Sequence, residues 1–298
     1  MSSAQLGSAA LPALAPARSE TWRHVRYVLA ENPLTLVALL GCASIALTAL
    51  FGPMLAPYSP LASDTNAALS PPSAAHWFGT DQLGRDILSR VVVATRLDLG
   101  IALGAVSLSF AIGSVAGAWA GFRGGLVDRV ISRCADTIMA FPLFVLAMGI
   151  VAALGNTVSN IVYATAVVNL PFYVRLARAE VARLREAGFV EAAQIGGNRP
   201  LSVLLRHLYP NTLPPLVVQV SLNLGWALLN AAGLSFIGLG IRPPTAEWGI
   251  MVADGANFVV SGQWWIALFP GLAIMFTALC FNFLGDGMRD ILDPRRRT

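Results

Sequence analysis

The stretch EAGFVEAAQIGGNRPLSVLLRHLYPN, residues 186–211, is a polar, arginine-bearing segment between two long apolar runs. Its first part is rich in Glu and Ala, which favour helix. Two adjacent glycines, Gly196 and Gly197, are expected to break that helix. A second short helix is expected to follow, with Asn198 as its cap and Pro200 in its first turn.

The second short helix has an apolar face, and Pro210 is expected to end it. The leucines of this face are Leu201, Leu204, Leu205 and Leu208. The pattern therefore predicts two short helices at an angle to each other, in water beside a membrane. Small alanines on the first helix would let the surface of a partner protein approach closely.

The composition of the whole chain is typical of a membrane protein. Of its 298 residues, 56% are hydrophobic and 12% are charged, whereas soluble proteins have about 25% charged residues. All 20 basic residues are arginine. Because a phosphate-binding P-loop needs a lysine, we expect no ordinary nucleotide site in this chain. The net charge of +4 comes from arginines that flank apolar runs, which indicates cytoplasmic anchors rather than nucleic-acid binding.

Six apolar runs are expected to cross the membrane as helices. They cover residues 34–56, 97–121, 137–154, 161–177, 213–240 and 264–285. Arginine-rich segments between the runs and at both ends of the chain indicate that both termini are cytoplasmic. The fold class that we predict is an all-α integral membrane protein with six transmembrane helices.

The order of the runs also predicts how the chain is organised. We expect a cytoplasmic tail over residues 1–32 and a cytoplasmic tail over 287–298. Between them lie a first span with its outer loop, over 33–96, and a core of five helices over 97–286, whose cytoplasmic loop covers about 180–211.

The outer loop contains a candidate amphipathic segment within residues 76–96. Ile87, Leu88, Val91 and Val92 fit one apolar face of a short helix that would lie on the membrane surface.

Glycines recur at intervals of four in the second predicted span. The two sets are Gly100 with Gly104, and Gly113 with Gly117 and Gly121. Such spacing gives a smooth helix face on which another helix can pack closely. Lining of a pore is the alternative interpretation.

The ionisable residues argue against a self-powered carrier and against an enzyme. The acidic residues near the predicted spans all fall at or beyond the span ends: Asp98, Asp128, Asp136, Glu180 and Asp286. Carriers driven by protons usually place such groups within their spans. The histidines and cysteines show no catalytic or metal-ligand spacing; they are His24, His76, His207, Cys42, Cys134 and Cys280. We therefore expect neither catalytic residues nor a metal site, and energy for transport would have to come from a partner.

The fifth predicted span has one polar face. Gln219, Asn223 and Asn230 recur at helical spacing, with Trp226 between them. These amides either form hydrogen bonds between helices or line a substrate path, and the sequence alone leaves both interpretations open.

Several motifs resemble one family of membrane proteins. EAA at residues 191–193 with Gly197 four residues further on, followed by RHLYPN, resembles the coupling loop of permease subunits of ATP-binding-cassette importers. Four further stretches are similar to the second, C-type permease of dipeptide, oligopeptide and nickel importers. They are HWFGTDQLGRDILSR from residue 76, FRGGLVDRVISRCADTIMAFP from 122, GLSFIGLGIRPPTAEWG from 233 and FNFLGDGMRDILDPR from 281. Tyr209 departs from the family, which more often has an aliphatic residue or Phe there.

The resemblance implies a type I importer transmembrane domain in a bacterial inner membrane. Its coupling loop would dock on an ATPase subunit through Glu191, Ala192, Ala193, Gly197, Arg206, His207 and Pro210. The implied partners are a homologous second permease, two ATPase subunits that bind ATP and Mg²⁺, an extracytoplasmic substrate-binding protein and the lipid bilayer. Peptides are the expected substrate, with nickel chelates, glutathione or opine-like solutes as alternatives. A stand-alone secondary carrier and a membrane enzyme are the competing classes.

Overall fold

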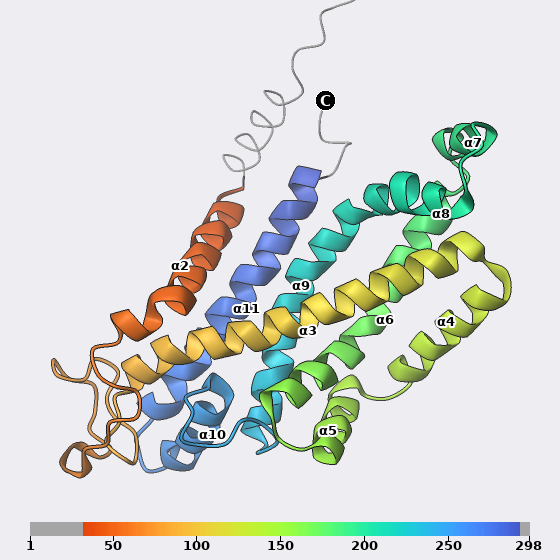
Figure 1. Cartoon of the computed structure of the whole chain (residues 1–298). Helices are drawn as coiled ribbons and strands as arrows, with labels where there is room; N and C mark the ends of the chain where they lie inside the picture. The colour runs from red at the N-terminus through yellow and green to blue at the C-terminus, as the bar shows by residue number, and fades with distance from the viewer. Residues whose placement is uncertain (1–31, 293–298) are drawn as a thin grey trace, which may run out of the picture.

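The computed structural model describes residues 32–292, which form a bundle of long helices (Figure 1). The predicted tails lie largely outside this range, so the anchors Arg18, Arg23 and Arg26 and the final three arginines are not described. In chain order the elements are α2 (Pro33–Leu55), the 3₁₀ turn η1 (Thr65–Ala67), α3 (Ile87–Arg123), α4 (Gly125–Met139), α5 (Leu143–Leu154), α6 (Val158–Leu184), α7 (Gly188–Ile195), α8 (Pro200–Val203), the π-helical η2 (Leu204–Leu208), α9 (Tyr209–Phe236), α10 (Trp248–Val259) and α11 (Trp265–Leu292).

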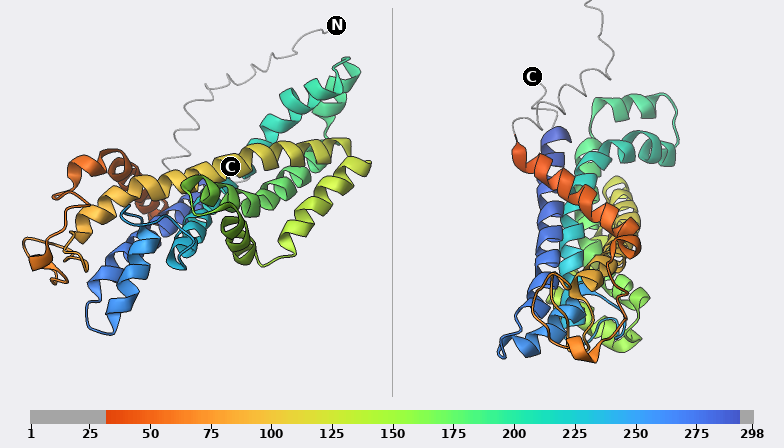
Figure 2. Two further views of the ribbon diagram at one scale, coloured as in Figure 1. Left: turned by 60° about the horizontal axis from the view of Figure 1, so that its bottom comes forward. Right: turned by 90° about the vertical axis from the view of Figure 1, so that its left-hand side faces the viewer.

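The long helices run up and down between two ends of the bundle. The elements α7, α8 and η2, residues 188–208, protrude at one end, and we call them the 188–208 hairpin (Figures 1 and 2). The loop after α2 lies at the opposite end together with α10 (Figure 1). The main apolar core lies between these ends and joins α3, α6, α9, α10 and α11.

Length and apolar composition identify the elements that can cross a membrane. Four continuous helices qualify: α2, α3, α11 and the single rod formed by α8, η2 and α9 over residues 200–236. The pair α4 and α5 qualifies only as one span that bends by 89°. The chain is thus an all-helical membrane protein with four or five spans by this criterion, and the sixth span stays a prediction.

The bent pair corrects one boundary of the predicted spans. We expected a cytoplasmic segment over residues 122–133 and a span over 137–154, but α4 begins at Gly125 and ends at Met139. Pro142 follows, at the N-cap of α5, and a proline cannot continue the preceding helix because it lacks the N–H donor. The chain therefore turns between α4 and α5 instead of forming one helix.

The prediction of a separate amphipathic helix within residues 76–96 is also wrong. Ile87 begins α3, and the helix continues without interruption to Arg123. Asp86 caps its start by accepting hydrogen bonds from the backbone N–H of Ser89 at 2.8 Å and from its hydroxyl at 2.6 Å. Ile87 and Val91 are buried in the main core, so the apolar face that the pattern revealed packs on protein and not on lipid.

The glycine pattern of α3 is confirmed in one of its two sets. Gly113, Gly117 and Gly121 face the backbone of α6 so closely that a Cβ atom at each would overlap a backbone carbonyl oxygen of α6. By contrast, a Cβ at Gly100 would meet nothing within 4 Å, and one at Gly104 would make ordinary contact with Val162. Close helix packing thus needs glycine only in the second set.

This difference predicts the effect of adding one methyl group to α3. Gly117→Ala should lower the unfolding temperature of the purified protein in detergent, because the Val174 carbonyl cannot move without separating α3 from α6. The expected cost is about 1–3 kcal/mol, typical of overpacking. Gly100→Ala is the matched control: it gains the same helix propensity but meets open space, so it should not be destabilised. Equal unfolding temperatures for the two variants would contradict the proposed packing.

Candidate functional site

The tip of the 188–208 hairpin is a sharp turn that closes α7. Gly197 has a φ of +77°, which lies in the left-handed region that favours glycine. Its N–H donates to the Gln194 carbonyl at 3.0 Å. Asn198 then donates twice to the Ala193 carbonyl, from its backbone N–H at 3.2 Å and from its side chain at 2.9 Å. The glycines therefore end α7 as the sequence predicts.

Asn198 does not cap the second helix, which corrects the prediction. The N-cap residue of α8 is Arg199, and no side-chain oxygen accepts a hydrogen bond from the first turn of this helix. Asn198 instead uses its backbone and side-chain N–H groups to close α7. Pro200 does occupy the first turn of α8. There its missing N–H removes no helical hydrogen bond.

Pro210 does not end the element either. The helix passes from α8 through η2 into α9 as one rod over residues 200–236, and Pro210 lies in the first turn of α9. The π turn of η2 directly before it is marked by the Tyr209 N–H, which donates to the Leu204 carbonyl five residues back. Such turns accommodate a local break in the helical hydrogen-bond pattern. The hairpin is thus a direct extension of a membrane helix.

The underside of the hairpin is fixed to the bundle by an apolar cluster. Val190, Val203 and Leu208 are fully buried there, and Leu204 is nearly so. They pack together with Ala118 of α3 and Val181 of α6. Burying four such side chains contributes several kcal/mol, at about 1.5–3 kcal/mol each. The hairpin therefore moves as one body with the ends of α3, α6 and α9.

The outer face of the hairpin is exposed. Glu191, Ala192 and Gly197 are exposed, and Ala193 is half-buried. Next to them Ile195 has 81% of its side chain exposed. Further exposed apolar side chains on the hairpin are Phe189, Leu201 and Leu205.

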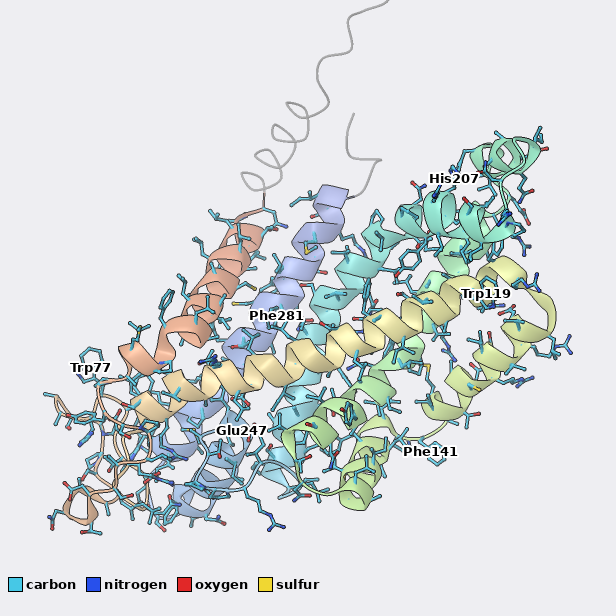
Figure 3. All side chains as sticks on the ribbon, in the orientation of Figure 1. Trp77, Trp119, Phe141, His207, Glu247 and Phe281 are labelled. Atoms are coloured by element: carbon cyan, nitrogen blue, oxygen red, sulfur yellow. The ribbon has the colours of Figure 1, made fainter. Side chains whose placement is uncertain are left out.

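The remaining predicted coupling residues lie on the return helix (Figure 3). Arg206 and Pro210 are exposed, and His207 is half-buried. Glu191, Ala192 and Gly197 thus lie at or next to the tip of the hairpin. The predicted coupling residues of η2 and α9 lie further along the chain. A cluster of exposed apolar side chains on a rigid support is typical of a surface that binds another protein.

Tyr209 links the base of the hairpin to α3. Its hydroxyl forms a 2.8 Å hydrogen bond with the Ser114 hydroxyl, 95 residues earlier in the chain. Ser114 is fully buried and also donates to the Phe110 carbonyl at 2.6 Å. Tyr209, which departs from the family pattern, thus has the Ser114 hydroxyl as a specific hydrogen-bond partner.

The polar face of α9 has two buried amides, Asn223 and Asn230, and one amide that lines a cavity, Gln219. Asn223 and Asn230 are each only 5% exposed, and the Asn230 carbonyl oxygen lies 3.4 Å from the Thr165 hydroxyl of α6. Trp226 meets Phe172 of α6 edge to face, with ring centroids 6.4 Å apart. Gln219 alone lines a cavity near the hairpin end, and its amide donates to Asn223 at 2.9 Å.

Two acidic residues are buried in the bundle, and one of them, Asp98, lies inside a helix although it was predicted at the end of a span. Asp98 is 3% exposed, eleven residues inside α3, and Glu247 is fully buried. Asp98 accepts a hydrogen bond from the Trp248 N–H at 3.1 Å and lies next to the Glu247 side chain. Glu247 caps α10 by accepting from the N–H groups of Gly249 and Ile250 at 2.9 and 2.8 Å.

The acid pair lies near the end opposite the hairpin, where Glu247 is labelled in Figure 3. The hydrogen bond from the Trp248 N–H to Asp98 links α10 to α3. The sequence missed it because Glu247 fell in a predicted loop, and the helix α10 that begins next to it was not recognised.

The loop after α2 is held to the bundle by ion pairs. Asp81 and Arg85 form a buried pair with 2.6 Å between Oδ2 and Nε, and Arg90 lies 3.7 Å from the same oxygen. Burial raises the pKa of nearby Asp254, although Arg85 and Arg90 oppose this rise. Among residues 32–292, no cluster of three His, Cys, Asp or Glu side chains has the geometry to hold a metal ion.

The sequence of the chain matches one class of protein, the membrane components of transport systems. The family of binding-protein-dependent transport system inner membrane components matches residues 113–298. The N-terminal transmembrane domain of oligopeptide transport permease C matches residues 20–72.

Curated relatives extend over nearly the whole chain. A probable D,D-dipeptide transport system permease protein of Escherichia coli is 45% identical over 269 residues, 90% of each chain. A dipeptide transport system permease protein of Alkalihalophilus pseudofirmus is 42% identical over 93% of this chain and 91% of its own. A glutathione transport system permease protein of Escherichia coli is 38% identical over 93% of this chain and 90% of its own.

The chain therefore belongs to the family of binding-protein-dependent transport system inner membrane components, as its C-type permease. This confirms the family that the motifs predict. Members of this family are transport subunits and not enzymes, and the chain is a multi-pass inner membrane protein.

The Tyr209 contact generates a prediction about the hairpin. Tyr209→Phe removes the hydrogen bond to Ser114 and should destabilise the base of the hairpin by about 1 kcal/mol. Limited trypsin digestion of the detergent-solubilised protein should then cleave after Arg206 about fivefold faster, as a 1 kcal/mol change implies. Tyr163→Phe is the matched control, because Tyr163 is exposed and forms no hydrogen bond with any of residues 32–292. If the two variants are cleaved at the wild-type rate, the hydrogen bond does not hold the hairpin.

Proposed function

We propose that this chain is the transmembrane permease subunit of an ATP-driven, binding-protein-dependent importer of dipeptides and oligopeptides. The observation that carries the proposal is the 188–208 hairpin, which presents an exposed apolar face on a base that is buried against α3 and α6. Two relatives that share about nine-tenths of their length with this chain are named dipeptide permeases.

The hairpin is the proposed contact with an ATPase subunit. Ile195, Ala192 and Gly197 are exposed at its tip and would enter a groove on that subunit, next to Glu191. The absence of lysine from the chain supports the assignment of ATP and Mg²⁺ to the partner ATPases. Because the hairpin continues directly into α9, a movement of the ATPase subunit would be transmitted to a membrane helix without an intervening flexible joint.

We propose α6 as the sixth span. It has 27 residues, which is enough to cross a bilayer, and its packing against α3 is the most extensive helix contact of residues 32–292. Arginines gather at its hairpin end, including Arg175, Arg178 and Arg183. Since basic residues favour the cytoplasmic side, the hairpin and both termini would be cytoplasmic.

The opposite end would then face outward. The loop at residues 56–86 and α10 lie there (Figure 1), and exposed Trp77 and Val260 fit a surface that receives the substrate-binding protein. A homologous second permease would complete the translocation path. Glutathione is a second candidate substrate, because a relative that is 38% identical is named a glutathione permease.

Substitution of Gly197 tests the coupling role. Gly197→Asp places a side chain where φ is +77°, which costs about 1–2 kcal/mol for an L-residue, and adds a charge to the tip. In proteoliposomes that contain the whole importer, peptide uptake should fall at least tenfold, while the amount of permease inserted in the membrane stays unchanged.

Gly188→Asp is the matched control. Gly188 is exposed on the same hairpin, has an ordinary φ, and a Cβ there meets nothing within 4 Å, so uptake should remain close to wild type. Normal uptake by Gly197→Asp, with the ATPase subunits still bound, would refute the coupling role of the tip.

A further inference from the structure

We propose that a cavity at the hairpin end of the bundle binds the charged terminal groups of a peptide as it leaves the translocation path. The cavity lies between α6, α9 and α11 and has a volume of about 430 Å³. This is within the range of 300–1,000 Å³ that is usual for small-ligand sites. The inference deepens the proposed function, on which it rests, by assigning a site to the substrate.

Charged and amide side chains surround the cavity. Glu180 and Arg183 come from α6, Asn211 and Gln219 from α9, and Arg289 from the last turns of α11. The other lining side chains are apolar, among them prolines and leucines. A zwitterion with apolar side chains matches this combination of charges, amides and apolar surface.

The charges of the cavity are unequal in number and only partly paired. Arg183 forms an ion pair with Glu180, with 2.8 Å between Nη2 and Oε2. Arg289 forms no ion pair with any of residues 32–292. The structure thus leaves one guanidinium for a ligand carboxylate, which arginine binds through two parallel hydrogen bonds. Glu180 is the acidic group that can accept hydrogen bonds from a ligand ammonium.

A polar run continues from the cavity into the bundle. Gln219 donates to Asn223 at 2.9 Å, and Asn223 is one helical turn deeper and 5% exposed. The Asn223 side chain interacts with the neighbouring Tyr173 hydroxyl, and neither Asn223 Nδ2 nor that hydroxyl forms a hydrogen bond with another group of residues 32–292. Gln219, Asn223 and Tyr173 therefore form a run of polar groups that leads from the cavity towards the interior of the bundle.

The depth of these groups separates a peptide from a membrane lipid. A phospholipid bound at this end would place its headgroup near the arginines and its acyl chains deeper, against Gln219 and Asn223. Acyl chains offer no hydrogen bonds to the amide atoms that the Gln219–Asn223 bond leaves over, and polar atoms without partners in an apolar environment are costly. A peptide, by contrast, offers carbonyl and N–H groups along its length.

The test uses the complete importer in proteoliposomes and radiolabelled alanyl-alanine as the probe. The measured quantity is peptide uptake per ATP hydrolysed. Arg289→Gln should lower it about tenfold, the size expected for one charge-assisted hydrogen-bonded pair. Gln219→Leu should lower it about threefold, as for one neutral hydrogen bond. Arg133→Gln is the matched control, because Arg133 is exposed on α4 and lies outside the cavity.

A second readout identifies the ligand directly. A photo-reactive benzophenone side chain at Leu222, which lines the cavity, should label the peptide during ATP-driven turnover. The same group at Leu268, exposed on α11 outside the cavity, should not label it.

The outcomes separate the two proposals. If the wild-type importer takes up no peptide with ATP, the proposed function fails and this inference fails with it. If wild type transports, but both cavity variants keep wild-type uptake per ATP, only the proposal that the cavity binds the peptide is refuted. Labelling of phospholipid alone from position 222 would also refute it, because the cavity would then be a lipid site.

Discussion

The close contact between α3 and α6 is the constraint on which the rest of the structure depends. Three glycines of α3, Gly113, Gly117 and Gly121, let the backbones approach until only hydrogen atoms fit between them. Beyond the last glycine, Arg178 of α6 pairs with Asp128 of α4. This contact fixes the hairpin end of α6, and the buried underside of the 188–208 hairpin rests on that end through Val181.

A rigid base makes the hairpin suitable for transmitting force. Four buried side chains and the hydrogen bond from Tyr209 to Ser114 fix its underside, and its helix continues into α9. The other face has exposed apolar side chains that favour a protein partner. At the opposite end, the hydrogen bond from the Trp248 N–H to Asp98 and the ion pair between Asp81 and Arg90 fasten the outer segments to α3, so a tilt of α3 or α9 would move both ends.

Sequence patterns predicted the features that depend on local chemistry. The glycine break at Gly197, the close-packing set that includes Gly117, and the apolar spans follow from backbone freedom, helix periodicity and hydropathy. The features missed depend on tertiary contacts. Ile87 looked lipid-facing because the pattern reveals an apolar face but not what covers it, and Pro210 looked like a helix end because a π turn has no sequence signature. Asp98 looked interfacial because its partner Glu247 is 149 residues away.

We propose that the energy for transport enters this subunit through the exposed tip of the 188–208 hairpin. Cysteine crosslinking in the complete importer tests it most directly, with Ile195→Cys at the tip and Val260→Cys at the opposite end, positions that are 81% and 97% exposed. We expect position 195 to crosslink to an ATPase subunit and position 260 to form no such crosslink. An assembled, transporting complex in which position 195 forms no crosslink to either ATPase subunit would contradict it.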